Sequence, residues 1–365
     1  STKHDKERYE HKYEYCDLLI AGSGPSGLAS AYSAAKNGAK IILAEDKARF
    51  GGTLLTDDVN IGNQNGKEWA DNIISELKKM PNVIVKNRSQ VFGYYDHNML
   101  VMSERISDHL PITQKYIPKQ RLWYIRAKEV IISSGSIERP LVFGNNDTPG
   151  VMLSSAAKEY LKIYGVLVGK KPLIFTNNDS GYETAIEFKK NGIEPIILDT
   201  RKNPNSEIIN EAKNLNIITK FSYVVVAANG YKKVKSAQIA KISDDKKVLG
   251  IIENIDCDCI CVSGFWTPTI HLASQSGAKT KFNKEIDAFV PDKSKQKEIT
   301  VGSANGIYTL EETLKTSFEA GYQLSKKITS IDNKVSVPSV VEKKSEEHDK
   351  FWCVPLPKGK NYKRF

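Results

Sequence analysis

Short apolar runs alternate with amphipathic segments along this chain of 365 residues, which is the pattern of an α/β protein. The first series begins with an apolar run at 17–21, continues as an alanine-rich segment that ends at Gly38, and returns to an apolar run at 40–44. It predicts a strand, a helix and a second strand, the βαβ unit that opens a parallel sheet. The next elements expected are a helix at 67–80, a third parallel strand at 83–86, a hairpin at 89–103, and strands at 120–126 and 128–133.

A second α/β series follows a connector rich in Pro, Gly and Asn. Its expected elements are a helix at 154–164, a strand at 171–176, a helix at 180–190, a strand at 194–199, then a helix and meander-like strands up to 256. A strand at 258–263 is expected to return the chain to the first domain, which closes with a strand at 298–302 and a helix at 310–327.

A glycine triplet lies at the turn between the first expected strand and helix. Gly22, Gly24 and Gly27 form G-x-G-x-x-G, with Pro25 and Ser26 inside it. The first glycine permits a tight turn, the second lets a pyrophosphate approach the backbone, and the third lets the helix pack closely on the strand. The helix N-terminus then presents its N–H groups and the positive end of its dipole to the phosphates. This context predicts a dinucleotide-binding site.

An acidic residue, Glu45, follows the second strand at the spacing of a carboxylate that accepts a hydrogen bond from a ribose 2′-hydroxyl. It would repel a 2′-phosphate, which favours NAD or FAD over NADP, although Arg49 lies close by in the sequence. The glycine pair at 51–52 is typical of flavoproteins with two dinucleotide domains, where it lets the chain pass close to a cofactor.

The corresponding turn of the second series, Asn-Asn-Asp-Ser-Gly at 177–181, lacks the triplet, and Asp179 would oppose a phosphate. We therefore predict an α/β fold of the two-dinucleotide-binding-domain flavoprotein type (pyridine nucleotide-disulfide oxidoreductase-like). The second domain is inserted in the first and has a degenerate nucleotide site. The expected parts are a connecting segment at 1–16, a first domain at 17–165 and 263–330, an inserted domain at 166–262, and a linker or docking tail at 331–365.

Two further strand ends are expected to line the first site. Ser134 and Gly135 follow an apolar strand where such flavoproteins carry Ala-Thr-Gly and cross beneath the nucleotide. The last strand of these proteins usually ends in Gly-Asp, whose aspartate holds the ribityl chain of the flavin, but here Gly302 is followed by Ser303. This departure favours a dinucleotide without a ribityl chain.

The composition, with 40% hydrophobic and 26% charged residues, describes an ordinary soluble globular protein. The formal net charge of +10 comes from dispersed lysines rather than from a basic stripe with interleaved aromatics, so nucleic-acid binding is not expected. No apolar run approaches the length of a membrane span, and residues 1–15 do not resemble a signal peptide. We expect a cytoplasmic protein with no membrane partner.

Three of the five cysteines, Cys257, Cys259 and Cys261, alternate inside an apolar stretch. Their thiols are expected on one strand face, with no histidine or fourth cysteine at ligand spacing. We predict buried strand cysteines, with neither a metal site nor a disulfide.

Several stretches resemble, in order along the chain, the α subunit of the heterotetrameric, tetrahydrofolate-linked sarcosine oxidases. They are RYEHKYEYCDLLIAGSGPSGLASA, VFGYYDHN, SGSIERPLVFGNNDTPGVMLSSA, FTNNDSGYETA, VSGFWTPTIHLASQSG and VGSANGIYTLEETL. In that family the α subunit is larger, with a ferredoxin-like segment before this region and a folate-binding domain after it. The resemblance implies that this chain is the central nucleotide-binding portion.

The resemblance also implies that the chain holds NAD non-covalently in its first dinucleotide fold, with the backbone near Val91 beside the adenine. The expected cofactor-binding residues are Gly22, Gly24, Pro25, Ser26, Gly27, Glu45, Asp46, Gly52, Thr53, Val91, Ser134, Gly135, Gly302 and Ser303. No catalytic residue of this chain is implied.

The other cofactors and partners implied by the resemblance lie outside this chain. They are the β, γ and δ subunits, FAD in the β subunit where sarcosine is oxidised to glycine, FMN at the interface with the β subunit, and tetrahydrofolate on a following domain. Electrons would pass from FAD to FMN and then to O2, and the one-carbon unit would pass to tetrahydrofolate.

Two alternatives stay open. The first is an FAD-binding α component of an opine, proline or cyanide-forming dehydrogenase, which shares the fold but usually carries cysteines spaced for an iron–sulfur centre. The second is a redox-silent scaffold that keeps a nucleotide site, because an intact triplet and Glu45 indicate binding and not redox turnover.

Overall fold

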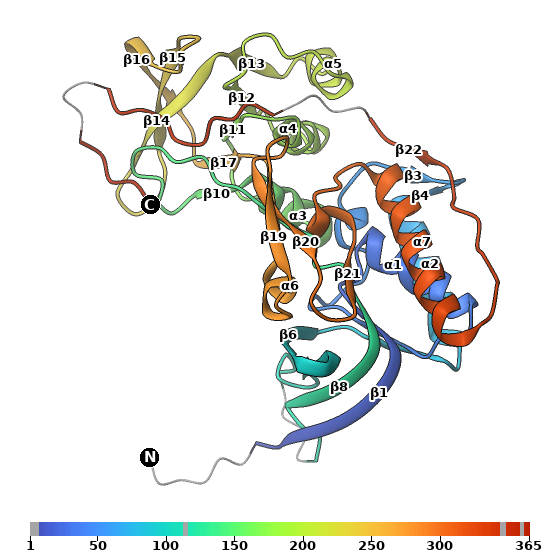
Figure 1. The fold of residues 1–365 in the computed structure, drawn as a ribbon. Helices are drawn as coiled ribbons and strands as arrows, with labels where there is room; N and C mark the ends of the chain where they lie inside the picture. The colour runs from blue at the N-terminus through green and yellow to red at the C-terminus, as the bar shows by residue number, and fades with distance from the viewer. Residues whose placement is uncertain (1–6, 112–115, 344–347, 358–360) are drawn as a thin grey trace. The chain divides into compact units, whose positions relative to one another are not determined.

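A computed structural model gives the fold of the chain and describes residues 7–111, 116–343, 348–357 and 361–365 (Figure 1). The chain divides into two compact units. Unit 1 comprises 1–137 and 267–342, and unit 2 comprises 138–266 and 343–365.

Unit 1 is built on a seven-stranded sheet. Its strands are β1 (Tyr9–Ala21), β2 (Ile41–Ala44), β5 (Val83–Lys86), β6 (Ser89–Tyr95), β7 (Met99–Arg105), β8 (Gln120–Ile132) and β21 (Glu298–Thr300). Their order is β5-β2-β1-β8-β7-β6, and β21 also pairs with β8. Strands β5, β2, β1, β8 and β21 are parallel, whereas β7 and β6 continue the sheet as an antiparallel hairpin.

Three helices, α1 (Pro25–Lys36), α2 (Gly66–Lys79) and α7 (Leu310–Thr329), cover one face of this sheet (Figure 1). Alternate strand residues such as Leu18 and Ile41 pack against them, while Leu19 and Ile42 face the other side with the β6–β7 hairpin. Helix α2 begins with a capping box between Asn65 and Glu68. In it, each side chain accepts a hydrogen bond from the backbone N–H of the other residue, so these N–H groups at the start of the helix are satisfied.

The remaining elements of unit 1 are short. They are η1 (Gly52–Leu55), β3 (Asn60–Ile61), β4 (Gln64–Asn65), η2 (Asp96–Asn98), α6 (His271–Gln275), β19 (Lys279–Asn283), β20 (Ala288–Lys293), η3 (Gly302–Asn305) and β22 (Val340–Val341). Strands β9 (Ser136–Glu138) and β18 (Trp266–Pro268) pair where the chain passes from one unit to the other.

Unit 2 is built on a five-stranded parallel sheet in the order β10-β17-β11-β12-β13. These strands are β10 (Val151–Leu153), β11 (Pro172–Thr176), β12 (Ile196–Asp199), β13 (Ile218–Phe221) and β17 (Cys259–Ser263). Helices α3 (Ser154–Tyr164), α4 (Ser180–Lys190) and α5 (Glu207–Asn214) pack on one face. The antiparallel strands β14 (Tyr223–Asn229), β15 (Ser236–Ile242) and β16 (Val248–Asp256) form a separate sheet.

The predicted βαβ opening, the third parallel strand and the hairpin are confirmed, as are the helices at 154–164 and 180–190. The two strands predicted at 120–126 and 128–133 are one strand, β8. The strand is continuous because β1 pairs along its whole length, although β7 flanks only its first half and β21 only its end.

The boundaries of the two units differ from the predicted domain boundaries. Residues 138–165 and 263–266 belong to unit 2 and not to the first domain. The physical reason is that β10 pairs in parallel with β17, so both lie in the sheet of unit 2. The return to unit 1 therefore comes after β17, at 267, and not with the strand predicted at 258–263.

The predicted end segments also differ. Residues 9–16 are no connecting segment, because they form the first part of β1, paired with β8. The predicted tail is partly folded: β22 pairs with β3, and Phe351 and Val354 are buried in the core of unit 2. The parts of these two predicted segments at 1–6, 344–347 and 358–360 lie outside the described residues.

The cysteine prediction is confirmed in part. Cys259 and Cys261 lie on one face of β17 with their sulfurs 3.6 Å apart, but Cys257 precedes the strand and packs in the opposite core. All five cysteines are free thiols. In the part of the chain that the structure describes, no helix has the length and apolarity needed to cross a bilayer.

Candidate dinucleotide-binding site

The site lies where β1 turns into α1 at the carboxyl edge of the unit 1 sheet. Gly22 has φ +106°, and a Cβ there would lie 2.2 Å from the carbonyl oxygen of Ser133. A Cβ on Gly27 would lie 2.0 Å from the carbonyl oxygen of Gly22. Only glycine fits at either position. Gly22 therefore permits the tight turn, and Gly27 permits the close helix packing, as the motif predicts.

Gly24 differs from the other two glycines. It is the N-cap of α1 with φ −66°, and an added Cβ would meet no atom within 4 Å. The direction in which a Gly24 side chain would point is therefore open space. Pro25 at the first helical position lacks an N–H, and the N–H groups of Ser26 and Gly27 have no acceptor inside the helix. Open space beside these donors suits an approaching phosphate.

A second loop closes on this turn. The Gly51 N–H donates to the Ser23 carbonyl oxygen across 3.0 Å. A Cβ on Gly52 would lie 2.8 Å from the Gly24 Cα. The glycine pair thus allows the two backbones to touch, and Thr53 follows in η1 with its side chain exposed.

Glu45 is buried directly after β2 and is bound by three donors. Its Oε2 accepts from the Ser23 N–H at 2.9 Å and from the Ser23 hydroxyl at 2.6 Å, while its Oε1 accepts from the Lys47 N–H at 3.0 Å. Burial and a hydrogen bond with the Asp46 carboxyl raise the pKa of Glu45 from 4.5 to about 7, against the opposing effect of these donors. The carboxyl therefore titrates near neutral pH.

The strand ends of β8 and β21 complete the cluster. The Ser134 hydroxyl donates to the Thr269 carbonyl at 2.8 Å, which fixes the crossing segment. A Cβ on Gly135 would lie 4.0 Å from the Ser303 Oγ, and one on Gly302 would lie 2.7 Å from the Ser26 side chain. These contacts place both predicted strand ends beside the first turn of α1.

Val91 is connected to the rest of the site only through the backbone of its strand. It is half-buried in β6, two residues beyond Ser89, whose N–H donates to the Glu45 carbonyl oxygen at 2.7 Å. The Asp46 carbonyl oxygen accepts from Arg105 at 2.8 Å, and the Asp46 side chain is exposed. Asp46 thus directly follows the acid at the end of β2, and Val91 lies in the strand whose first residue is hydrogen-bonded to that acid.

Two residues that the sequence did not single out shape the site. Ser23 holds Glu45 by both its N–H and its hydroxyl, and the Ser133 hydroxyl donates to the Ala21 and Gly22 carbonyls at 2.8 Å each. A polar residue inside the glycine triplet was a signal for Ser23. Ser133 offered none, because its role depends on the neighbouring strand.

The residues present fit a dinucleotide. Glycines shape a turn with free space at Gly24, the first N–H groups of α1 have no acceptor inside the helix, and a buried carboxyl group stands at the end of the next strand. Among the described residues, no group of three or more His, Cys, Asp or Glu side chains could hold a metal ion.

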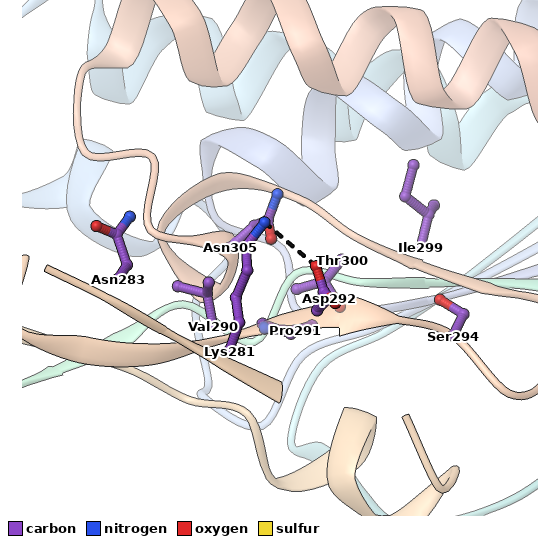
Figure 2. Close-up of a pocket in the computed structure, with 9 residues that line it drawn as sticks. All are labelled: Lys281, Asn283, Val290, Pro291, Asp292, Ser294, Ile299, Thr300 and Asn305. Atoms are coloured by element: carbon purple, nitrogen blue, oxygen red, sulfur yellow. Dashed lines mark ion pairs between the residues drawn. The ribbon is translucent and has the colours of Figure 1, made fainter. Parts of the chain in front are cut away.

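A hollow of about 390 Å³ lies beside the β19–β20 hairpin (Figure 2). It is lined by Lys281, Asn283, Val290, Pro291, Asp292, Ser294, Ile299, Thr300 and Asn305. Lys281 and Asp292 point toward one another and form an ion pair of 3.2 Å, so these two charges neutralise each other. None of the residues predicted to hold a dinucleotide lines this hollow.

The sequence matches the pyridine nucleotide-disulphide oxidoreductase family over residues 16–309. The sarcosine oxidase subunit alpha of Rhizobium meliloti (strain 1021) is 36% identical over 306 residues, which are 83% of this chain and 30% of that protein. The sarcosine oxidase subunit alpha of Corynebacterium sp. (strain P-1) is 30% identical over 358 residues, 97% of this chain and 37% of that protein. The chain thus spans about a third of the length of these relatives.

Among solved structures, T. acidophilum thioredoxin reductase superposes with a TM-score of 0.66 at 16% identity, over 86% of this chain and 99% of that chain. At this identity the similarity concerns the fold, and it confirms the predicted fold class. The resemblance noted in the sequence is confirmed as well. The chain belongs to the pyridine nucleotide-disulphide oxidoreductase family and is homologous to the α subunits of sarcosine oxidases.

Proposed function

We propose that this chain is the NAD-binding portion of the α subunit of a multimeric sarcosine oxidase. The observation that carries the proposal is the buried Glu45 carboxylate, which Ser23 ties to a glycine turn with open space at Gly24. This arrangement offers an acceptor for a ribose hydroxyl and donors for a pyrophosphate on one sheet edge. The homology to sarcosine oxidase α subunits supplies the enzyme class.

The choice of NAD over FAD follows from the end of β21. Ser303 stands where a flavin-binding relative would carry an aspartate for the ribityl chain, and its hydroxyl lies near Gly135. The choice of NAD over NADP follows from Glu45, because a carboxylate repels a 2′-phosphate. When bound, NAD would supply a hydride-accepting nicotinamide. The residues of this chain would hold its adenosine and phosphates.

The rest of the proposal concerns parts of the enzyme outside this chain. Sarcosine would be oxidised to glycine on a β subunit that carries FAD, and electrons would reach O2 through FMN at the interface with that subunit. The one-carbon unit would pass to tetrahydrofolate on a following domain. With the γ and δ subunits, the assembly would work in the cytoplasm.

The first experiment is to purify the chain, denature it, and identify any released nucleotide by absorbance and mass. Release of NAD without flavin supports the proposal. FAD in equal amount to protein would overturn the argument from Ser303 and favour the α component of an opine, proline or cyanide-forming dehydrogenase. A chain that releases nothing is then titrated with NAD, and absence of binding rejects the NAD site.

A variant pair tests the location of the site. Gly24→Asp adds a carboxylate at a position where the new Cβ has no protein atom within 4 Å, so we expect a folded chain that no longer binds NAD. Asn210→Asp adds the same charge at an exposed position of α5 in unit 2, and this variant should bind NAD as the parent does. Equal NAD affinity of both variants would contradict the proposed location.

The sarcosine assignment needs the intact oxidase. Its O2 consumption should depend on sarcosine, and formaldehyde release should fall when tetrahydrofolate is added. An intact oxidase that consumes O2 with other amines and not with sarcosine would reject this part and leave the NAD site untouched.

A further inference from the structure

Unit 2 keeps the layout of a dinucleotide-binding unit. Strand β11, the turn at 177–179, helix α4 and strand β12 follow one another as β1, the glycine turn, α1 and β2 do in unit 1. Asp199 ends β12 and lies as far past Gly181 in the sequence as Glu45 lies past Gly27. In open α/β sheets, ligands bind outside the carboxyl ends of the strands.

A segment of the chain itself, residues 348–352, lies across these carboxyl ends, and we call it the strap. At the end of β11, the Asn177 side-chain amide donates to the Asp349 and Phe351 carbonyls at 2.8 and 3.2 Å. The Asp349 N–H donates back to the Asn177 carbonyl at 2.9 Å. The first turn residue after β11 therefore binds peptide groups.

The strap is also held at the ends of the two neighbouring strands. After β12, the Thr200 hydroxyl donates to Asp349 Oδ2 at 3.0 Å, and Lys246 pairs with the same carboxylate. After β17, the Trp352 indole N–H donates to the Gly264 carbonyl at 2.9 Å. The His348 ring stacks on Phe265 with centroids 3.9 Å apart. All three central strand ends thus contact the strap.

Burial fixes the strap further. Phe351 is 7% exposed and packs in the core of unit 2 with Phe175 and Val262. The chain beyond it stays attached, because the Val354 N–H donates to the Val142 carbonyl at 2.8 Å. Burying one large aromatic side chain contributes about 2 kcal/mol, so the strap is bound by more than hydrogen bonds.

The groups that would recognise a nucleotide in unit 2 are bound to each other. Asp199 is fully buried and accepts from the Tyr182 hydroxyl at 2.7 Å and from Arg201 Nη2 at 2.8 Å. Arg201 also pairs with Asp179, in the turn before α4, at 2.9 Å. The acid that would accept a ribose hydroxyl and the cation that would bind a 2′-phosphate thus neutralise each other.

We propose that the strap is the resident occupant of the dinucleotide crevice of unit 2. The unit anchors a peptide segment where related units bind a pyridine nucleotide, and it takes neither NADH nor NADPH from solution. The recognised peptide chemistry is Asp349 and, after one intervening residue, the aromatic pair Phe351 and Trp352. The site is separate from the proposed NAD site of unit 1.

Hydrogen exchange measured by mass spectrometry on the full chain tests the strap. We expect the Asp349 and Val354 amides to be protected, and to remain so in NADH or NADPH at roughly 1 mM, the upper range of typical substrate constants. The double variant Asn177→Ala, Thr200→Val removes the three side-chain hydrogen bonds that these residues donate to the strap, and it should speed exchange at Asp349 by roughly tenfold or more. The control Lys202→Ala removes an exposed ion pair with Asp244 and should leave it unchanged.

Two results would overturn the proposal. The first is exchange of the strap amides in the parent chain at the rate of an unstructured peptide. The second is NADH or NADPH binding to the Gly24→Asp chain together with faster strap exchange, which would make the strap a displaceable lid. A failure of unit 1 to bind NAD changes neither readout, so the two proposals fail independently.

Discussion

The Ser23 hydroxyl donates to Glu45 Oε2 across 2.6 Å, and the Ser23 backbone N–H donates to the same oxygen. The middle residue of the first G-x-G therefore orients the acid at the end of the next strand. These hydrogen bonds couple two parts of the dinucleotide motif that are far apart in sequence. The coupling has consequences for stability and for binding.

Removing the Ser23 hydroxyl should cost stability mainly when Glu45 is ionised. Hydrogen bonds to charged groups contribute about 1.5–3 kcal/mol, so we expect Ser23→Ala to lower the free energy of unfolding by about 2 kcal/mol at pH 8. The loss should be smaller at pH 5, where Glu45 is protonated. Ser33→Ala is a matched control, since the Ser33 hydroxyl is buried in α1 and makes no hydrogen bond. Equal losses at both pH values, measured by urea unfolding, would contradict the coupling.

The pKa of Glu45 predicts a pH dependence of stability with a definite sign. Burial, followed by the Asp46 hydrogen bond, raises this pKa from 4.5 to about 7, so the folded chain binds more protons than the unfolded chain between these values. Stability from this group is therefore present below pH 4.5 and is lost as the pH rises to 7, by up to roughly 3 kcal/mol.

Glu45→Gln removes that titration. The free energy of unfolding of the parent minus that of the variant should fall steadily from pH 5 to pH 8. A difference that stays constant over this range would show that Glu45 keeps its ordinary pKa.

Substitutions at two glycines of the triplet should have different effects, one on stability and the other on NAD binding. Gly27→Ala forces a Cβ to within 2.0 Å of the Gly22 carbonyl oxygen, so we expect it to destabilise unit 1 by about 3 kcal/mol although alanine is the better helix former. Gly24→Ala meets no protein atom and should unfold at the parent temperature while NAD affinity falls by roughly tenfold. Calorimetry of unfolding and of NAD binding measures both. A Gly24→Ala chain that melts early would mean that Gly24 serves packing.

The sequence predicted the glycine turn and the strands around it because their signals are local. Gly22, Gly27 and Glu45 stand at fixed spacings, and the apolar residues at 18–21 and 41–44 are buried in strands that the sequence alone indicates. Residues 9–16 and Phe351 were misassigned because their burial depends on distant partners. Tyrosines and charges alternate along the first part of β1, and only β8 makes it a strand. Phe351 lies in a polar, proline-containing stretch and is buried only by the core of unit 2.

Arg201 tests the buried charge cluster of unit 2. Replacing it by Met leaves Asp199 fully buried without its cation, which typically costs about 3–5 kcal/mol. Burial raises the pKa of Asp199, so the loss should be smaller at pH 5 than at pH 7, because the carboxyl of the variant can take up a proton. Lys202→Ala, in the next and exposed position, should change stability little. A loss for Arg201→Met no larger than for Lys202→Ala would indicate that the pair is not buried in solution.

The thiols give a test that covers both units. Cys353 is exposed, whereas Cys16, Cys257, Cys259 and Cys261 are buried. Burial raises the pKa of Cys16 and of Cys257 to about 12, so neither forms a reactive thiolate at pH 8. A thiol reagent should therefore modify one cysteine of the native chain and all five after denaturation, and Cys353→Ser should abolish the native reaction. Modification of Cys259 or Cys261 in the native chain would show that β17 is accessible to solvent. It would also revive a redox or metal-binding role for this pair, which the buried geometry opposes.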